Sequence, residues 1–401
     1  MLEKALTGSN RYYGCVAILL ALFGMGVYFY LHELEFGLAV TGMSRDVSWG
    51  LYISQFTFLV GIAASAVMVV LPYYLHDYKA FGRITVLGEF LAIAAVAMCV
   101  TFIFVNLGQP ARVFYVMIHP SFTSVLFWDM VVISVYLVLN VITGWTVLGS
   151  VREGVPPPAW VKPFIYISIP WAVSIHTVTA FIYAGMPGRS FWLTAIMAPR
   201  FLAAAFASGP ALLILLCFVL RRYGGFDAGK QAIDALAKIV TYSFIATIFF
   251  VVVELWTVFY SQVPDDMEHY RFLFVGLEGY NTVARFMNVA VISAAVALVL
   301  LFNPRTRKKE SFLTAACILV FISLWIEKGL GLLVTGFVPS PLGHITRYTP
   351  TWPEAAIAIG VWSMGFLIIT VLYKIFLSVR ESAELPEDMP EKPAAEMSVS
   401  S

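Results

Sequence analysis

The chain contains 401 residues, of which 60% are apolar and only 12% are charged, and its formal net charge is +1. This composition excludes an ordinary soluble globular domain, and the lack of a basic excess excludes a nucleic-acid-binding surface. The four cysteines stand singly, and no CxxC or CxxCH motif is present. We therefore expect no iron–sulfur cluster, metal centre or c-type haem on this chain.

Ten apolar runs are long enough to cross a bilayer, because a membrane helix needs about 20 such residues. The alternation typical of barrel strands is absent, and backbone groups in lipid need internal partners. The predicted fold class is an all-α integral membrane protein. The runs are 13–34, 50–75, 84–106, 122–149, 161–184, 200–220, 237–260, 282–302, 311–333 and 354–377.

The distribution of Lys and Arg predicts the orientation of these helices. The N-terminus, the loops after helices 2, 4, 6 and 8, and the C-terminus together hold about 17 of them, against about seven on the other side. The first run is long enough to span and no cleavage site follows it, so no cleavable signal peptide is expected. We predict a multi-pass protein of the cytoplasmic (inner) membrane with both termini cytoplasmic.

The segments outside the helices differ between the two sides. We expect a polytopic membrane domain over 1–380, followed by a polar, disordered cytoplasmic tail over 381–401. The outer loops are longer than most inner ones and rich in Pro, Gly and aromatic residues, which favours a docking surface for a partner outside the membrane. These loops are 35–49, 107–121, 185–199, 261–281 and 334–353.

A weak internal repeat divides the membrane domain. Phe58-Leu59 followed by Ala64-Ser65 recurs as Phe201-Leu202 followed by Ala207-Ser208. The small residues at these positions would let helices pack closely. The repeat predicts two four-helix bundles, helices 2–5 (about 50–184) and helices 6–9 (about 200–333), flanked by helices 1 and 10.

Ionisable residues inside the apolar runs are the first candidates for function. A charged group in hydrocarbon is costly unless it is paired or hydrated, so it usually marks a functional site. By the predicted topology these residues fall toward the outer face of the membrane, which favours chemistry on protons, ions or a polar ligand head there. They are Asp129, His176, Glu254, Glu327 and Lys328.

A series of short segments gives a more specific indication through its order and spacing. The segments are Trp49–Tyr52, Asn106–Arg112, Ser124–Asp129, His176-Thr177, Pro187–Arg189, Pro199–Phe201, Ala207–Pro210 and Arg347–Glu354. Together they resemble the NrfD/PsrC family of membrane quinone-interacting subunits, over nearly the whole chain. Ten helices favour the longer branch of that family. Within it the chain is most similar to the DsrP subfamily, with the QrcD, HybB and ActC subfamilies as alternatives.

The resemblance implies a subunit without haem or an iron–sulfur cluster of its own. Such a subunit exchanges electrons between membrane menaquinol and an iron–sulfur, ferredoxin-like protein docked on the periplasmic side. In complexes of this branch a periplasmic multihaem cytochrome c and other membrane subunits are further partners, and the DsrP subfamily belongs to sulfur-compound metabolism. The direction of electron flow, the quinone used and any coupled proton translocation stay open.

Asp129 and His176 are the predicted catalytic residues. Quinol oxidation releases protons, so the pocket needs an acceptor within hydrogen-bond reach of a quinone oxygen, and either side chain can serve. The structural alternative for Asp129 is a partner for a nearby Arg or Trp, and for His176 a satisfied core histidine. Haem ligation by His176 would need a second buried His, and none faces it in the sequence pattern.

Five further residues are predicted to bind the quinone near the outer end of the helices. A guanidinium from Arg112, Arg189 or Arg200 can hold a negatively charged quinone oxygen, whereas the alternative is contact with lipid headgroups. Tyr52 can stack on or bond to the ring, with an interfacial aromatic belt as the alternative. Gln55, one turn deeper on the same helix, is harder to explain by lipid contact.

The remaining buried ionisable residues are candidates for a proton path. Glu327 and Lys328 are neighbours that point to different sides of a helix, so we expect Lys328 to pair with Glu254. The alternative for this set is a structural ion pair. Glu89, near the inner end of helix 3, is either an inner proton entrance or, as we expect, a solvated helix end.

Two other function classes compete with a quinone-interacting subunit. The first is a secondary transporter or proton-conducting membrane subunit, which usually places polar sites near the midplane on broken helices. The polar groups here lie toward one face, which disfavours that class. The second is a b-type cytochrome, which the missing pairs of buried histidines disfavour.

Overall fold

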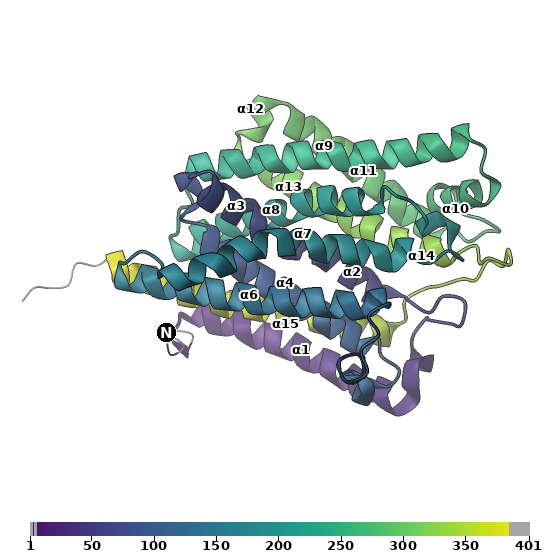
Figure 1. Cartoon of the computed structure of the whole chain (residues 1–401), viewed down its shortest axis with the longest axis horizontal. Coiled ribbons are helices and arrows are strands. Elements are labelled where there is room, and N and C mark those ends of the chain that lie inside the picture. The colour runs from purple at the N-terminus through teal and green to yellow at the C-terminus, as the bar shows by residue number, and fades with distance from the viewer. Residues whose placement is uncertain (1–2, 4–5, 385–401) are drawn as a thin grey trace, which may run out of the picture.

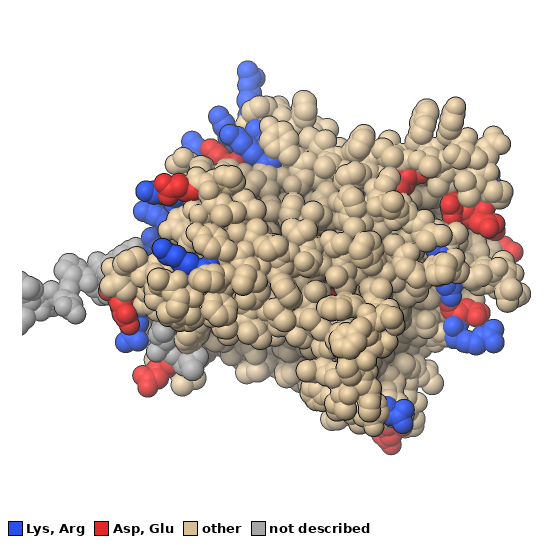
Figure 2. Space-filling model, viewed as in Figure 1, with Lys and Arg blue, Asp and Glu red and all other residues tan. Residues whose placement is uncertain are grey.

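The computed structural model describes residue 3 and residues 6–384, and they form helices joined by loops, with no β-strand in this part of the chain. Ten helical segments are long and apolar enough to cross a membrane within those residues, as the sequence predicts. The helices run side by side along the long axis of the molecule (Figure 1). On the face shown in Figure 2, charged side chains gather at the two ends of the helices, and few are seen between them.

The spans follow the predicted runs with small shifts at their ends. The segment 385–401, which holds most of the predicted tail, lies outside the described residues, and the last helix continues to Glu384. The membrane helices are α1 (Asn10–Phe36), α2 (Leu51–Ala63) with α3 (Val67–Leu75), α4 (Thr85–Val105), α6 (Val125–Glu153), α7 (Lys162–Ala184), α8 (Met197–Gly224), α9 (Lys230–Tyr260), α11 (Thr282–Phe302), α13 (Glu310–Trp325) with α14 (Leu332–Phe337), and α15 (Trp352–Glu384).

Three short helices lie at the two ends of the molecule. They are α5 (Tyr115–Ile118), α10 (Pro264–Phe274) and α12 (Pro304–Arg307). Figure 1 places α10 and α14 at one end of the long axis and α12 and α3 at the other. The α10 end carries the loops that the sequence predicts as outer, so we refer to it as the predicted outer end.

Helix contacts connect the spans into two circuits. In the first group α2 contacts α4, α4 contacts α6, α6 contacts α7, and α7 contacts α2. In the second group α8 contacts α9, α9 contacts α11, α11 contacts α13, and α13 contacts α8. Helix α1 packs on α15, and α15 packs on α4 and α6 of the first group. Two four-helix bundles would make these contacts, and the division of the chain into such bundles stays a prediction.

The two groups meet where the repeated small residues face each other. A Cβ atom placed on Gly209 of α8 would lie 3.0 Å from the Cα atom of Ser65, and one on Gly61 of α2 would lie 3.3 Å from the Oγ atom of Ser208. Glycine at both positions allows this close approach of helices. The small residues of the sequence repeat therefore form the contact between α2 and α8.

Two of the spans are interrupted near that contact. Between α2 and α3 the helical pattern breaks at Ala64–Ala66, and the hydroxyl of Tyr136 on α6 donates a hydrogen bond of 3.1 Å to the Ala63 carbonyl oxygen. In the ninth span a π-helical segment, Ile326–Gly331, joins α13 to α14, and Gly329 within it has non-helical angles (φ −85°, ψ −106°). Both breaks are accommodated inside the protein, where neighbouring groups can satisfy the freed backbone.

At the predicted outer end, one buried carboxylate connects the loops to α2. Glu354 accepts hydrogen bonds from the backbone amides of Leu51 (2.9 Å) and Gly42 (3.1 Å) and from the Tyr348 hydroxyl. Burial, followed by the nearby Glu354 charge, raises the pKa of Tyr348, so its hydroxyl stays protonated and donates. An acidic group at the N-terminus of a helix is also favoured by the helix dipole.

Candidate functional site

Asp129 lies near the N-terminal end of α6 and is buried. Its Oδ1 atom accepts a hydrogen bond of 2.6 Å from the hydroxyl of Thr179 on α7. This bond fixes the orientation of the carboxylate and leaves acceptor capacity for another donor, because a carboxylate has two oxygens.

His176 lies on the same face of α7 as Thr179 and Tyr183, which follow it at helical spacing. Its side chain is fully buried, and neither ring nitrogen has a hydrogen-bond partner among the described residues. The Tyr183 and Thr57 hydroxyls are hydrogen-bonded to each other, which connects this face of α7 to α2. A buried imidazole without partners is costly, so this position calls for a ligand or water.

Thr179, on the same face of α7 as His176, thus connects this face to Asp129 on α6, and no hydrogen bond joins Asp129 and His176 among the described residues. Asp129 interacts electrostatically with Tyr183, and also with Cys99 of α4. The sequence predicts a site at Asp129 and His176. The structure adds Thr57, Thr179 and Tyr183 to the polar groups near these two residues. The spacing of Thr179 and Tyr183 from His176 was a signal that could have identified both.

Tyr52 and Gln55 form hydrogen bonds with residues of α1, α13 and α15 and not with Asp129 or His176. The Tyr52 hydroxyl donates a hydrogen bond of 2.6 Å to Glu33 on α1. Gln55 accepts two bonds at its Oε1 atom, from the indole nitrogens of Trp325 (2.8 Å) and Trp362 (2.9 Å). Both side chains are buried, and among the described residues neither has a hydrogen bond to Asp129 or His176. Their predicted role at the quinone therefore stays a prediction.

Two of the three predicted arginines lie in loops at the predicted outer end. Arg112 is exposed in the turn Pro110–Arg112, with its guanidinium 5.9 Å from the centre of the Tyr115 ring. Arg189 is half-buried, 4.7 Å from the centre of the Phe337 ring, and donates to the Phe337 carbonyl oxygen at 3.3 Å. These contacts hold Arg189 in the loop before α8, near the outer end of the helices where the sequence predicts it.

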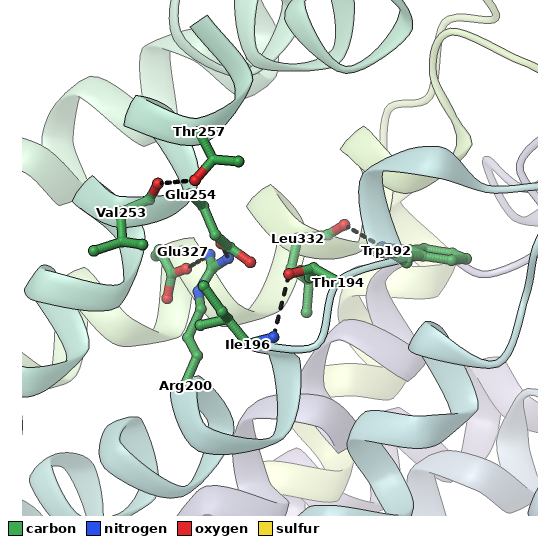
Figure 3. Close-up of polar contacts among 9 residues, drawn as sticks. All are labelled: Trp192, Thr194, Ile196, Arg200, Val253, Glu254, Thr257, Glu327 and Leu332. Atoms are coloured by element: carbon green, nitrogen blue, oxygen red, sulfur yellow. Dashed lines mark hydrogen bonds and ion pairs between the residues drawn. The ribbon is translucent and has the colours of Figure 1, made fainter. Parts of the chain in front are cut away.

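Arg200 differs from this expectation because it is buried in an ion triad. Its guanidinium bonds to Glu254 of α9 and to Glu327 of the π-helical segment (Figure 3). The predicted pair of Lys328 with Glu254 is therefore wrong. The physical reason is geometric, since the planar fork of Arg can bind two carboxylates at once, whereas Lys328 points away from its neighbour Glu327.

Glu89 also differs from the expectation of a solvated helix end. It is buried in α4, and its Oε2 atom has no hydrogen-bond partner among the described residues. Helix α6 covers it, since a Cβ atom on Gly144 would lie 3.3 Å from that same oxygen. Thr143, Asn140 and Tyr136 continue along α6 from this point, so the inner half of the first group holds several polar groups.

Two surface cavities accompany this interior, and neither is lined by Asp129 or His176. One of about 700 Å³ lies between α9 and the segment after α3, with Lys230, Asp234 and Lys238 among its lining residues. The other, of about 300 Å³, lies at the predicted outer end. Three of the predicted docking loops meet in the outer cavity, through Arg189, His269 and Ser340 among others.

His269 of α10 forms part of the wall of the outer cavity. Its Nδ1 atom is 2.8 Å from the Thr335 carbonyl oxygen and 3.1 Å from that of Val338, which requires Nδ1 to be the protonated nitrogen. Burial lowers the pKa of His269, against smaller raising effects of those carbonyls and of Asp266 and Glu268. The described residues contain no group of three or more His, Cys, Asp or Glu side chains that could hold a metal ion.

Comparison with known proteins identifies the family of this chain. The model of the family described as "Polysulphide reductase, NrfD" matches residues 39–339, and the chain belongs to this family. A proposed membrane subunit of a dimethyl sulfoxide reductase from Halobacterium salinarum is 27% identical, covering 89% of this chain and 88% of the relative.

Two further relatives match over nearly their whole length. The Hdr-like menaquinol oxidoreductase integral membrane subunit of Archaeoglobus fulgidus is 24% identical, over 95% of this chain and 97% of the relative. The menaquinone reductase integral membrane subunit of Nitratidesulfovibrio vulgaris is 20% identical, over 92% of each chain. The names of these relatives describe membrane subunits of oxidoreductases, and two of them name a menaquinone or menaquinol.

Proposed function

We propose that this chain is the quinone-interacting membrane subunit of a multisubunit respiratory oxidoreductase. The observation that carries the proposal is the fully buried His176, whose ring nitrogens have no partner in the described part of the chain, on the helix face from which Thr179 bonds to the buried Asp129. The names of its relatives support menaquinone or menaquinol as the substrate. Electrons would pass to or from a redox partner carried by another subunit.

Proton transfer is the role of Asp129 and His176 in this proposal. A quinol hydroxyl placed between them can donate to the free acceptor capacity of Asp129 or to an unprotonated nitrogen of His176. Thr179 orients the Asp129 carboxylate, so that residue needs no rearrangement to accept the proton. The rings of Trp49, Trp192 and Tyr183 contact one another above this region and would limit the entry of water from the predicted outer end.

The partners follow from the predicted topology. We place both termini in the cytoplasm and the α10 end in the periplasm, where the loops that meet at the outer cavity would dock a ferredoxin-like iron–sulfur subunit. Because the chain resembles the DsrP subfamily, we also propose a multihaem cytochrome c as a periplasmic partner. The same resemblance supports a role in sulfur-compound metabolism. Arg112 and Arg189 lie at this docking face.

The proposed function is tested in the purified complex with a soluble quinol such as menadiol. Asp129→Asn and His176→Ala should each lower quinol-linked electron transfer at least a hundredfold, as loss of a general base does, while all subunits remain assembled. Asp77→Asn and His76→Ala are matched controls at exposed positions away from the docking loops and should behave like the unmodified complex. Normal turnover in both site variants would reject this location for the quinone site.

Proton conduction is a second candidate function, and one observation favours it. From the buried Glu89 a row of polar groups follows α6 through Thr143 and Asn140 to Tyr136, whose hydroxyl reaches the open Ala63 carbonyl. A continuous row of polar groups can bind ordered water molecules and transfer protons along them. Glu89→Gln in proteoliposomes separates the candidates, because a proton path requires loss of proton uptake from the cytoplasmic side, and a structural Glu89 does not.

A further inference from the structure

The π-helical segment Ile326–Gly331 turns two adjacent charged residues toward different helices. Glu327 meets Arg200 of α8, as described above. Lys328 instead places its ammonium 4.3 Å from the centre of the Phe201 ring and beside α2, where a Cβ atom on Gly61 would lie 3.4 Å from its Nζ atom. π-helical turns inside α-helices are frequent at functional sites, because the extra residue re-aims a side chain.

Lys328 is buried and its ammonium lacks a hydrogen-bond partner among the described residues. Neither Glu254 nor Glu327 hydrogen-bonds to it: Arg200 binds one oxygen of each, and Glu254 Oε1 has no partner among the described residues. A buried ammonium is tolerated when something satisfies it, and the contact with the Phe201 ring satisfies it only in part. The position therefore has the properties expected of a ligand-binding cation.

The ammonium also faces the candidate quinone site. It is within electrostatic range of Glu327 and Arg200 of the ion triad, and also of His176 on α7 and Cys99 on α4. The Phe201 ring beneath the ammonium is 5.9 Å from the Tyr183 ring, which belongs to the same face of α7 as His176. Lys328 of the second group thus reaches the interior of the first group at the α2–α8 contact.

We propose that Lys328 is a quinone-binding residue, supplied by the second helix group to the site that Asp129 and His176 form in the first. Its ammonium would donate a hydrogen bond to a quinone or quinol oxygen. The proposal rests on the proposed quinone function. It gives a role to Lys328 of the π-helical segment, next to the Glu327 that the ion triad uses.

The test uses the complete complex and the substitution Lys328→Met, which keeps the length of the side chain and removes the charge. We expect the Michaelis constant for menadiol to rise at least tenfold, as for loss of a hydrogen bond from a charged donor, with a smaller change in kcat. Bound menaquinone, extracted from the purified complex, should fall in parallel. Lys238→Met, at an exposed position, is the matched control and should change neither value.

A second substitution keeps the charge. Phe201→Leu removes the ring on which the ammonium rests, so we expect the Michaelis constant to rise in the same direction by a smaller factor, even if Lys328→Met fails to assemble. Glu254→Gln alters the ion triad and should lower thermal stability without raising the Michaelis constant. This contrast separates a binding role of Lys328 from a structural one.

The outcomes also separate this inference from the function on which it rests. If Asp129→Asn and His176→Ala abolish turnover while Lys328→Met and Phe201→Leu leave the Michaelis constant and the bound menaquinone unchanged, Lys328 is structural and the inference fails alone. If none of the four substitutions affects quinol turnover or bound menaquinone, the proposed function itself fails.

Discussion

The two helix groups treat buried charge in opposite ways. In the second group Arg200 bonds to one oxygen of Glu254 and one of Glu327, so each of these three charges has a counter-ion, although Glu254 Oε1 has no hydrogen-bond partner among the described residues. In the first group Asp129 has one hydrogen bond from Thr179, and His176 has none at either nitrogen within the described chain. Charges that are paired with counter-ions need no ligand to neutralise them, whereas a buried imidazole with no partner is incomplete without a ligand or water.

This difference indicates which cluster is structural and which is functional. Both clusters are buried, and both follow the same sequence signal of ionisable residues in apolar runs. Only the count of partners distinguishes them. Lys328 connects the two, because its backbone belongs to the second group and its ammonium faces the first.

The largest expected effect is at the centre of the ion-paired cluster. Arg200→Met would leave the carboxylates of Glu254 and Glu327 buried without a counter-ion, which costs about 3–5 kcal/mol for a broken buried pair. We expect a strongly reduced yield of assembled complex and a lower melting temperature. The exposed Arg83→Met is the control. An Arg200→Met complex of normal stability would remove the contrast between the two clusters.

The contact that joins the two groups should be the next most sensitive. Gly209→Ala would place a Cβ atom 3.0 Å from the Cα atom of Ser65, which α2 and α8 can accommodate only by moving apart. Overpacking of this kind costs about 1–3 kcal/mol. Gly149→Ala in α6 meets no atom within 4 Å and should be neutral or stabilising. Thermal unfolding of both variants in the same detergent measures the difference, and equal melting temperatures would contradict the close contact.

A smaller effect is expected at the cluster of Asp129 and His176. Thr179→Val removes the donor that orients Asp129, so we expect quinol turnover to fall about tenfold with little loss of stability, since a bond to a charged group contributes about 1.5–3 kcal/mol. Thr177→Val lies on the exposed face of the same helix, where its hydroxyl bonds to the Val173 carbonyl oxygen. Turnover that falls equally in both variants would mean that Thr179 has no special relation to the site.

The sequence predicted the membrane helices well because the length of an apolar run is a local property. It also identified Asp129 and His176 as buried, since both interrupt such runs. The partners of these residues were not predictable in the same way. Helical geometry predicts a pair of Lys328 with Glu254, whereas the structure pairs Glu254 with Arg200 and places the Lys328 ammonium against the Phe201 ring.

Arg200 and Glu89 show a second limit of the sequence. Both stand near the ends of apolar runs, which predicted a position at the membrane margin. In the structure α8 begins at Met197, and Glu254 and Glu327 surround Arg200, while α6 covers Glu89. Burial of these residues is decided by helices distant in sequence, and a single sequence without that packing carries no signal for it.

The smallest expected effect concerns the outer loops, which belong to neither cluster. Burial holds the pKa of His269 below its ordinary value, so the unfolded chain takes up a proton more readily than the folded one as the pH falls. The stabilising contribution of the neutral His269 should therefore be complete above the ordinary histidine pKa of about 6.5. It should be lost on acidification from there toward the lower pKa of the folded state.

His269→Asn keeps a donor for the Thr335 and Val338 carbonyl oxygens but cannot titrate, so the loss of melting temperature between about pH 7.5 and pH 5.5 should shrink. His119→Asn, at an exposed position in another outer loop, is the control and should leave the pH dependence as it was. An unchanged slope in His269→Asn would mean that the outer loops do not unfold together with the rest of the protein, and that the α10 end is a separate unit from both helix groups.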